Sequence, residues 1–299
     1  MVRQVHLRLR RSEPATRGLR RIALGHLTLA LACLQAAGPK PEAVHELRRQ
    51  LKQARATLRL LRPALGAQRL DPVERRIVRS AQRWSALRDL QALQPRLEAL
   101  GMAGPPPVDP ASHARSMSLT RRELQRVMGL IRAWRITADD EALLEDGLRE
   151  SYRHGRRSMR QALRDSGDSD WHRWRRHAKT LALQLALFET WNSRALERLG
   201  VGSAQLERLL GEDHDLAVLL ERALGDGLEP EQRTDLLQQR RVLQQRAAAL
   251  GAALYAKPFR KLRRNFHRDR ERWLASASRR ASRLRAPDHA GGRSQGRPH

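Results

Sequence analysis

Cysteine, aromatic residues and acidic residues are all scarce in this chain of 299 residues. Cys33 is the single cysteine, so the sequence excludes a disulfide framework and a cysteine-based zinc site. Aromatic residues make up 4% of the chain, which leaves few flat side chains on which the bases of a single-stranded nucleic acid could stack. These absences exclude small disulfide-stapled domains and disfavour single-strand nucleic-acid binders.

Basic residues, by contrast, are abundant: 59 Lys and Arg oppose 32 Asp and Glu, and the formal net charge is +27. Such an excess predicts a polyanionic partner, which could be nucleic acid, an anionic membrane or a phosphate polymer. Most of these residues are arginines, whose planar guanidinium group binds phosphate oxygens with two parallel hydrogen bonds. The 40% of apolar residues, dominated by Leu and Ala, predict an all-α fold with a sizeable core.

An apolar run at residues 22–37 follows Arg20 and Arg21 and superficially resembles a secretory signal. His26 and Thr28 interrupt the run, which is also too short to span a bilayer. We therefore expect a buried first helix, no membrane insertion and a cytoplasmic protein.

Helical periodicity extends through nearly the whole chain and is broken by segments rich in Pro and Gly. The pattern predicts an N-terminal extension (1–14), a helical domain (15–280) and a disordered basic tail (281–299). Within the domain, two halves of about four helices each, 15–165 and 169–280, are expected to form bundles. In the first half the predicted helices span 15–37, Pro41 to a break at Pro63 and Gly66, Asp71-Pro72 to about residue 100, 112–133 and 139–165. In the second half they span 169–193, 203–224, 229–250 and 252–280. Residues 101–110 are predicted to form a loop, and residues 165–170 a linker that supplies the N-cap of the helix at 169–193.

One basic stretch occurs twice, at residues 44–61 and 171–188. When the two copies are aligned, the matching pairs are His45 with His172, Arg48 with Arg175, Arg49 with Arg176, and Lys52 with Lys179. Their spacing of i, i+3, i+4 and i+7 places them on one face of a helix. The repeat predicts two halves that present matched basic surfaces to one extended anionic ligand.

The first copy carries the longer basic stripe, which spans an arc of about 140° opposite an apolar face. Its members are His45, Arg48, Arg49, Lys52, Arg55, Arg59 and Arg62. In the second copy Ala182 stands opposite Arg55, so that stripe is shorter. A solvated arginine-rich face is the alternative interpretation for a single stripe, but its duplication with the histidine retained favours binding.

These two stretches, with the companion stretches at 87–93 (LRDLQAL) and 210–220 (LGEDHDLAVLL), resemble the CHAD family of histidine-bearing α-helical domains. The resemblance covers roughly residues 15–280. It implies two four-helix bundles related by a pseudo-twofold axis, with a basic cleft or pore between them. It also implies inorganic polyphosphate as the ligand and association with polyphosphate granules. The implied contacts are His45, Arg48, Arg49, Lys52, Arg55, His172, Arg175, Arg176 and Lys179, to which the basic stripe adds Arg59.

Two further basic segments could add contacts. Their candidate residues are Arg153, Arg156, Arg157, Arg260, Lys261 and Arg264. Nucleic-acid binding through the same surface is the main alternative function, and weak binding of that kind is expected in any case. The sequence gives no indication of the oligomeric state.

Catalysis is not expected. The tripeptide Arg153-His154-Gly155 matches a motif of histidine phosphatases, but it lies in a helical pattern instead of after a strand. The stretch Glu212-Asp213-His214-Asp215 cannot direct four consecutive side chains at one ion on a helix, so we predict no metal site and a turn or helix start there. No phosphate-binding glycine loop, nucleophile elbow or acidic ExExK motif is present, so neither a cofactor nor a polyphosphate-processing activity is predicted.

Overall fold

The computed structural model describes residues 7–34, 41–84, 110–223 and 229–285, and within these ranges the chain forms helices and no strands, as predicted. The helices are α1 (Ala15–Cys33), α2 (Pro41–Arg59), α3 (Arg62–Gln82), α5 (Pro110–Ala133), α6 (Asp140–Asp165), α7 (Asp168–Ala186), the short 3₁₀-helix η1 (Glu189–Trp191), α8 (Arg194–Ala223), α9 (Pro230–Tyr255) and α10 (Phe259–Arg285). In these ranges no helix is both long enough and apolar enough to cross a membrane.

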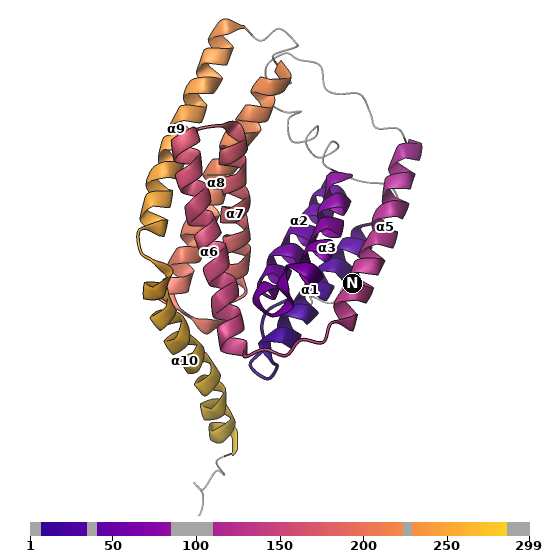
Figure 1. Cartoon of the computed structure of the whole chain (residues 1–299), viewed down its shortest axis with the longest axis vertical. Helices are drawn as coiled ribbons and strands as arrows, with labels where there is room; N and C mark the ends of the chain where they lie inside the picture. The colour runs from indigo at the N-terminus through magenta and orange to yellow at the C-terminus, as the bar shows by residue number, and fades with distance from the viewer. Residues whose placement is uncertain (1–6, 35–40, 85–109, 224–228, 286–299) are drawn as a thin grey trace, which may run out of the picture.

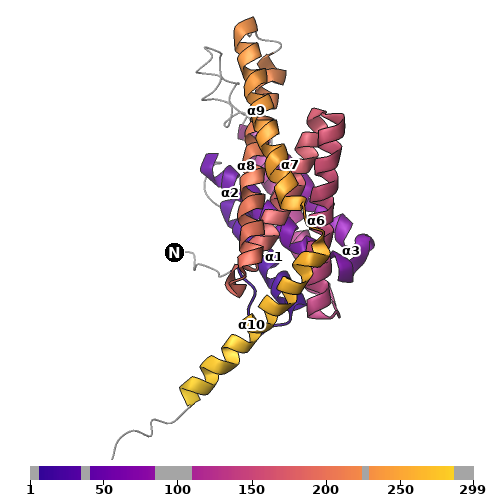
Figure 2. The same ribbon diagram turned by 90° about the vertical axis from the view of Figure 1, so that its left-hand side faces the viewer.

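The helices form two neighbouring groups (Figure 1). The first group consists of α1, α2, α3 and α5, and the second of α6, α7, α8 and α9. Helix α10 packs against α6 and η1 and extends past the lower end of the second group (Figure 2). One continuous cluster of buried apolar side chains includes residues of both groups, so the two groups share a core.

Helices α2 and α7 form the central contact between the two groups. The buried Gln184 of α7 donates a hydrogen bond from Nε2 to the carbonyl oxygen of Ala56 in α2, at 3.0 Å. Nearby, Gly147 of α6 approaches the backbone of Leu60 so closely that a Cβ atom there would lie 2.8 Å from the Leu60 carbonyl oxygen. A side-chain-to-backbone hydrogen bond therefore joins the two helices that carry the basic stretches, and the turn after α2 lies close to the backbone of α6.

The predicted helix boundaries are wrong at several places in the first half. Helix α2 ends at Arg59, and α3 begins at Arg62, well before the predicted start at Asp71-Pro72. Gly66 adopts a left-handed φ of 69° and bends the chain there, while Pro72 lies inside the helix that continues. Glycine, not the proline, marks the break. Helix α1 also ends at Cys33 instead of residue 37.

In the second half the prediction also placed two breaks incorrectly. Helix α7 ends at Ala186, and η1 and a left-handed Asn192 (φ 52°) separate it from α8. Helix α8 begins at Arg194, earlier than residue 203. The break between α9 and α10 lies at Lys257-Pro258, not near residue 251.

The connection between the end of α6 and the start of α7 also differs from the predicted linker. Residues 165–170 supply Gly167 as the N-cap of α7, and that cap has no side-chain hydrogen bond. The first-turn carboxylates of Asp168 and Asp170 stabilise the helix N-terminus instead. Helix α10 continues to Arg285, into the predicted tail. The predicted loop at 101–109 and the rest of the tail, 286–299, lie outside the described residues.

Candidate functional site

Helix α2 buries an apolar face and presents the predicted basic stripe. Val44, Leu47 and Leu51 are buried, while His45, Arg49 and Lys52 are exposed. Helix α7 likewise buries an apolar face and presents basic residues on the other side. Its buried residues include Trp171, Trp174, Ala178, Leu181 and Leu185. Because each apolar face packs into the core, the basic residues are forced to the surface along the contact between the two helices.

Cations of both helices line one hollow of about 200 Å³, which we call the His45 hollow. Its lining residues are His45, Arg48, Arg49, Lys52 and Gln53 of α2 and Lys179 and Leu183 of α7. A second hollow, of about 500 Å³, is called the Arg55 hollow. It is lined by Arg55 and Arg59 of α2, Arg176 of α7, and Asp71, Glu74, Arg75, Val78, Arg79 and Gln82 of α3. The two copies of the basic stretch therefore contribute to shared surfaces.

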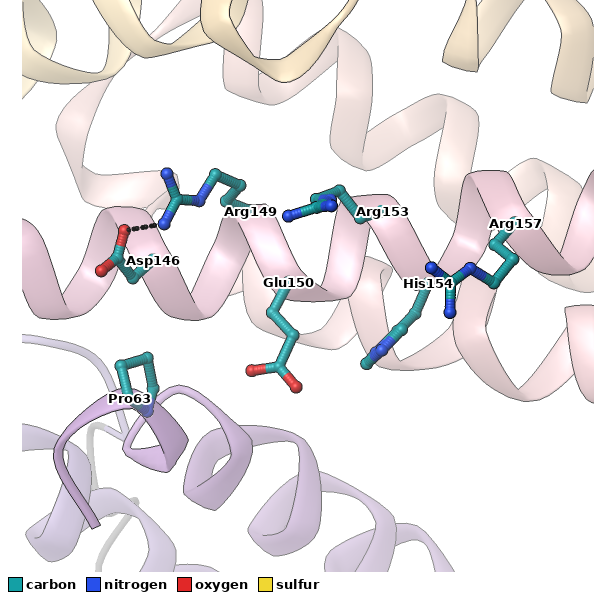
Figure 3. Close-up of a pocket in the computed structure, with 7 residues that line it drawn as sticks. All are labelled: Pro63, Asp146, Arg149, Glu150, Arg153, His154 and Arg157. Carbon is teal, nitrogen blue, oxygen red and sulfur yellow. Dashed lines mark ion pairs between the residues drawn. The ribbon is translucent and has the colours of Figure 1, made fainter. Parts of the chain in front are cut away.

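Helix α6 lines a third hollow, of about 400 Å³, which we call the His154 hollow (Figure 3). Its lining residues are Asp146, Arg149, Glu150, Arg153, His154 and Arg157 of α6 and Pro63 at the start of α3. In Figure 3, Glu150 and His154 extend from α6 toward the helix that carries Pro63. Two of the additional candidates, Arg153 and Arg157, thus lie at this hollow.

The other additional candidates lie elsewhere. Arg156 is half-buried and lines none of the three hollows. The three α10 candidates are exposed and line none of them either; they are Arg260, Lys261 and Arg264. The structure therefore does not bring the α10 residues together with the basic surface of α2 and α7.

The segment of the chain that carries most of these lining residues matches a known protein family. The family model described as the CHAD domain matches residues 21–224. The chain belongs to the CHAD family. Among solved structures, the crystal structure of the CHAD domain from the plant Ricinus communis is similar to it, with 18% sequence identity and a TM-score of 0.44 over 85% of this chain and 90% of that chain. No curated protein matches the chain.

Several cations of this CHAD domain already have protein partners. Arg49 makes a two-point ion pair with Glu46, at 2.7 Å for each contact, and Lys179 contacts Glu207 of α8 at 3.0 Å. Arg48 donates from Nη1 to the carbonyl oxygen of Ala81, at 2.6 Å. These partners fix the directions of the cationic side chains, so a ligand meets charges that are already oriented.

Glu74 is the buried counter-charge of the Arg55 hollow, and Asp71 is a second, more exposed one. The Glu74 carboxylate lies 2.5 Å from Nε of Arg59, 3.0 Å from Nη2 of Arg62 and 3.9 Å from Nε of Arg55. Arg62 also contacts Asp71 at 2.6 Å. Arg62, which the sequence placed in the stripe, is thus committed to carboxylates and lines none of the three hollows.

The two carboxylates that line this hollow, Asp71 and Glu74, do not balance its five arginines. Burial, and then the charges of Arg59 and Arg176, lower the pKa of Arg55 to about 10 although Glu74 acts in the opposite direction. Burial also lowers the pKa of Arg176, with further contributions from Arg173 and Arg59. Arginines from α2 and α7 therefore repel one another in the empty protein, and an anion placed between them would relieve that repulsion.

The two histidines that match in the sequence have different surroundings. His45 is exposed at the His45 hollow. His172 is half-buried against His214 of α8, with 3.3 Å between the two Nδ1 atoms. Burial, followed by the charges of His214, Arg176, Arg175 and Lys52, lowers the pKa of His172 to about 4. Arg175 lies close to Gly211 of α8, so this copy of the stripe is partly covered by α8.

Sequence reasoning missed the role of residues 212–215. The prediction of a turn or helix start there is wrong, because these residues lie in the middle of α8. Asp213 is buried and accepts a hydrogen bond from Nε of Arg240 at 3.0 Å, and His214 contacts His172. The helix predicted at 203–224 already included this segment, and the buried leucines at 206, 210, 216 and 220 follow its helical spacing.

Proposed function

We propose that this CHAD protein binds inorganic polyphosphate along the basic surface that α2 and α7 form together. The observation that carries the proposal is the meeting of Arg55, Arg59 and Arg176, from the two basic stretches, at one hollow with Glu74 as their close counter-charge. Like charges that are held close together repel one another, which raises the free energy of the empty protein. A densely charged anion offsets this repulsion.

The geometry favours a thin, flexible polyanion. The stripe from His45 to Arg59 is about 21 Å long at the helical rise per residue. The hollows lie in line with it and have volumes of about 200 and 500 Å³, which suit a chain of phosphate groups better than a duplex. Base stacking would need exposed aromatic side chains, whereas Trp171 and Trp174 of the second copy are buried.

The proposal includes a binding role without catalysis and a location in the cytoplasm at polyphosphate granules. Within the described residues, no group of three or more His, Cys, Asp or Glu side chains is arranged to hold a metal ion. The Arg153-His154-Gly155 tripeptide lies within α6, and the described element that precedes α6 is the helix α5.

A competition experiment tests the proposal directly. The full chain is bound to fluorescent long-chain polyphosphate at physiological salt, and unlabelled polyphosphate or RNA is added at equal phosphate concentration. We expect polyphosphate to compete at least about tenfold better, because it carries charge more densely and has no bases to accommodate. Equal or stronger competition by RNA would instead assign this surface to nucleic acid.

A further inference from the structure

Two histidines that are not among the predicted contact residues face each other between α6 and α7 of the second helix group. His154 lies on α6 and His177 on α7, and their ring centroids are 5.4 Å apart. His154 lines the His154 hollow with Arg153 and Arg157. His177 interacts electrostatically with Arg55, Arg59 and Arg176, which line the Arg55 hollow. The imidazole pair therefore lies between the two hollows.

The charged groups around the pair come from four helices. Arg55 and Arg59 belong to α2 and Arg176 to α7. Arg62 at the start of α3 and Arg157 of α6 act on His154, and Glu150 of α6 is the carboxylate that acts on it directly. Glu74 is a second carboxylate in this region, but it is paired with Arg59 and Arg62. Cations thus outnumber carboxylates around both rings.

We propose that His154 and His177 form a phosphate-binding subsite that takes up protons as the anion binds and that joins the Arg55 hollow and the His154 hollow into one ligand track. The inference rests on the proposed function, because polyphosphate supplies the anion. It extends the ligand track beyond α2 and α7 to Arg153 and Arg157 of α6, at the third hollow.

Burial and the surrounding positive charge together determine the protonation state of the two histidines. In the empty protein, burial and then His154, Arg59, Arg176 and Arg55 lower the pKa of His177 to about 3. Burial is also the largest cause that lowers the pKa of His154. Both rings are therefore neutral at pH 7, and each has one N–H donor.

A bound phosphate chain opposes the part of this balance that the surrounding charges contribute. Its negative charge offsets the arginines and favours the imidazolium form, which has two N–H donors. A metal ion is a poor alternative occupant, because the described residues bring no third metal-ligating side chain to the pair and the neighbouring arginines repel cations. Polyphosphate binding and protonation of the pair therefore strengthen each other.

Calorimetry tests the linkage. Long-chain polyphosphate is titrated into the full chain at pH 6.5 in two buffers of different ionisation enthalpy, which gives the number of protons taken up. The test variant carries His154→Gln and His177→Gln. The matched control carries His289→Gln and His299→Gln, which removes the same number of histidines outside the described residues. We expect proton uptake in the parent and in the control, and clearly lower uptake in the test variant.

The pH dependence of affinity gives a second measure. Each proton taken up changes the dissociation constant by up to about tenfold per pH unit, so the parent should gain affinity between pH 7.5 and 5.5 more steeply than the test variant. Circular dichroism checks that the double variant is folded. If the double variant does not fold, the single variant His154→Gln is used, because His154 is exposed.

The outcomes separate the two proposals. Absence of polyphosphate binding by the parent would reject the proposed function. Tight binding with the same proton uptake and the same pH dependence in parent and test variant would overturn the subsite and leave the proposed function standing.

Discussion

At the scale of single residues, the contact between the two helix groups depends on a position where no side chain fits. Gly147 of α6 faces the backbone of Leu60, and an added Cβ would lie 2.8 Å from the carbonyl oxygen and 2.9 Å from Cα of that residue. Backbone atoms at this junction cannot move aside as a flexible side chain could. The separation of α6 from the α2–α3 turn, and with it the width of the His154 hollow, is therefore set by a glycine.

We expect Gly147→Ala to lower the free energy of unfolding by about 1–3 kcal/mol, because the added methyl group forces the backbones apart. Gly129 of α5 provides a matched control, since nothing lies within 4 Å of the position of its Cβ. Gly129→Ala should be neutral or stabilise the helix by up to about 1 kcal/mol, because alanine loses less conformational entropy there. Urea denaturation of both variants measures the difference, and equal stabilities would show that the junction is not tight.

At the scale of helices, the sequence predicted which faces of α2 and α7 are basic, because the spacing of Leu47, Leu51 and Leu58 defines the opposite, buried face. It could not predict which basic residues are committed to protein partners. Glu74 is fifteen residues from Arg59 along the chain, and only the α2–α3 turn brings them together.

The partners of the histidines were equally hidden in the sequence. His214 lies 42 residues from His172, and its contact depends on the packing of α7 against α8. His154 and His177 come from different helices, and their contact depends on how closely α6 and α7 approach. Helix ends were also hard to place: the sequence marked a break at Gly66 and a new helix start at Asp71-Pro72, whereas the chain is helical on both sides of Gly66 and Pro72 lies inside the helix.

The location of the binding surface is testable by comparing two sets of three cations. Arg55→Gln, Arg59→Gln and Arg176→Gln together remove the charges that meet at the Arg55 hollow. We expect this variant to lose polyphosphate affinity by on the order of 100-fold, since each charge-assisted hydrogen bond contributes about 1.5–3 kcal/mol before partial solvent screening. Arg62 remains as the partner of Glu74, so the fold should persist.

The matched control removes the same net charge from α10 through Arg260→Gln, Lys261→Gln and Arg264→Gln, which are exposed and line none of the three hollows. Its affinity should fall by less than about tenfold, because only long-range attraction is lost. Equal losses in the two variants would mean that binding follows total charge and that no specific surface exists.

At the scale of the whole molecule, the charge of +27 makes the empty protein sensitive to any further protonation. Burial is the largest cause that lowers the pKa of five histidines. These are His26, His113, His154, His172 and His177. Each is held neutral in the folded chain at a pH where the unfolded chain would protonate it, so folding and polyanion binding favour opposite protonation states.

The sign of the pH dependence follows from proton counting. Between about pH 6.5, the usual histidine pKa, and about pH 4, the value for His172, the unfolded chain binds more protons than the folded chain. The free energy of unfolding therefore falls as the pH is lowered through this window. The lowered pKa values of Glu13 and Glu46 act in the same direction at lower pH, while the raised pKa of Asp213 acts in the opposite direction.

We predict that the empty protein loses stability when the pH is lowered from 7.5 to 5.0, and that the variant His172→Gln with His177→Gln loses less. The difference should be about 1 kcal/mol per histidine after solvent screening. Urea denaturation at the two pH values measures it, and the comparison cancels the carboxylates, which are the same in both proteins. Identical pH dependence in parent and variant would show that these histidines are not held neutral by the fold.

Saturating polyphosphate should weaken or reverse the pH dependence of the parent's stability, because the bound anion stabilises the imidazolium forms that destabilise the empty protein.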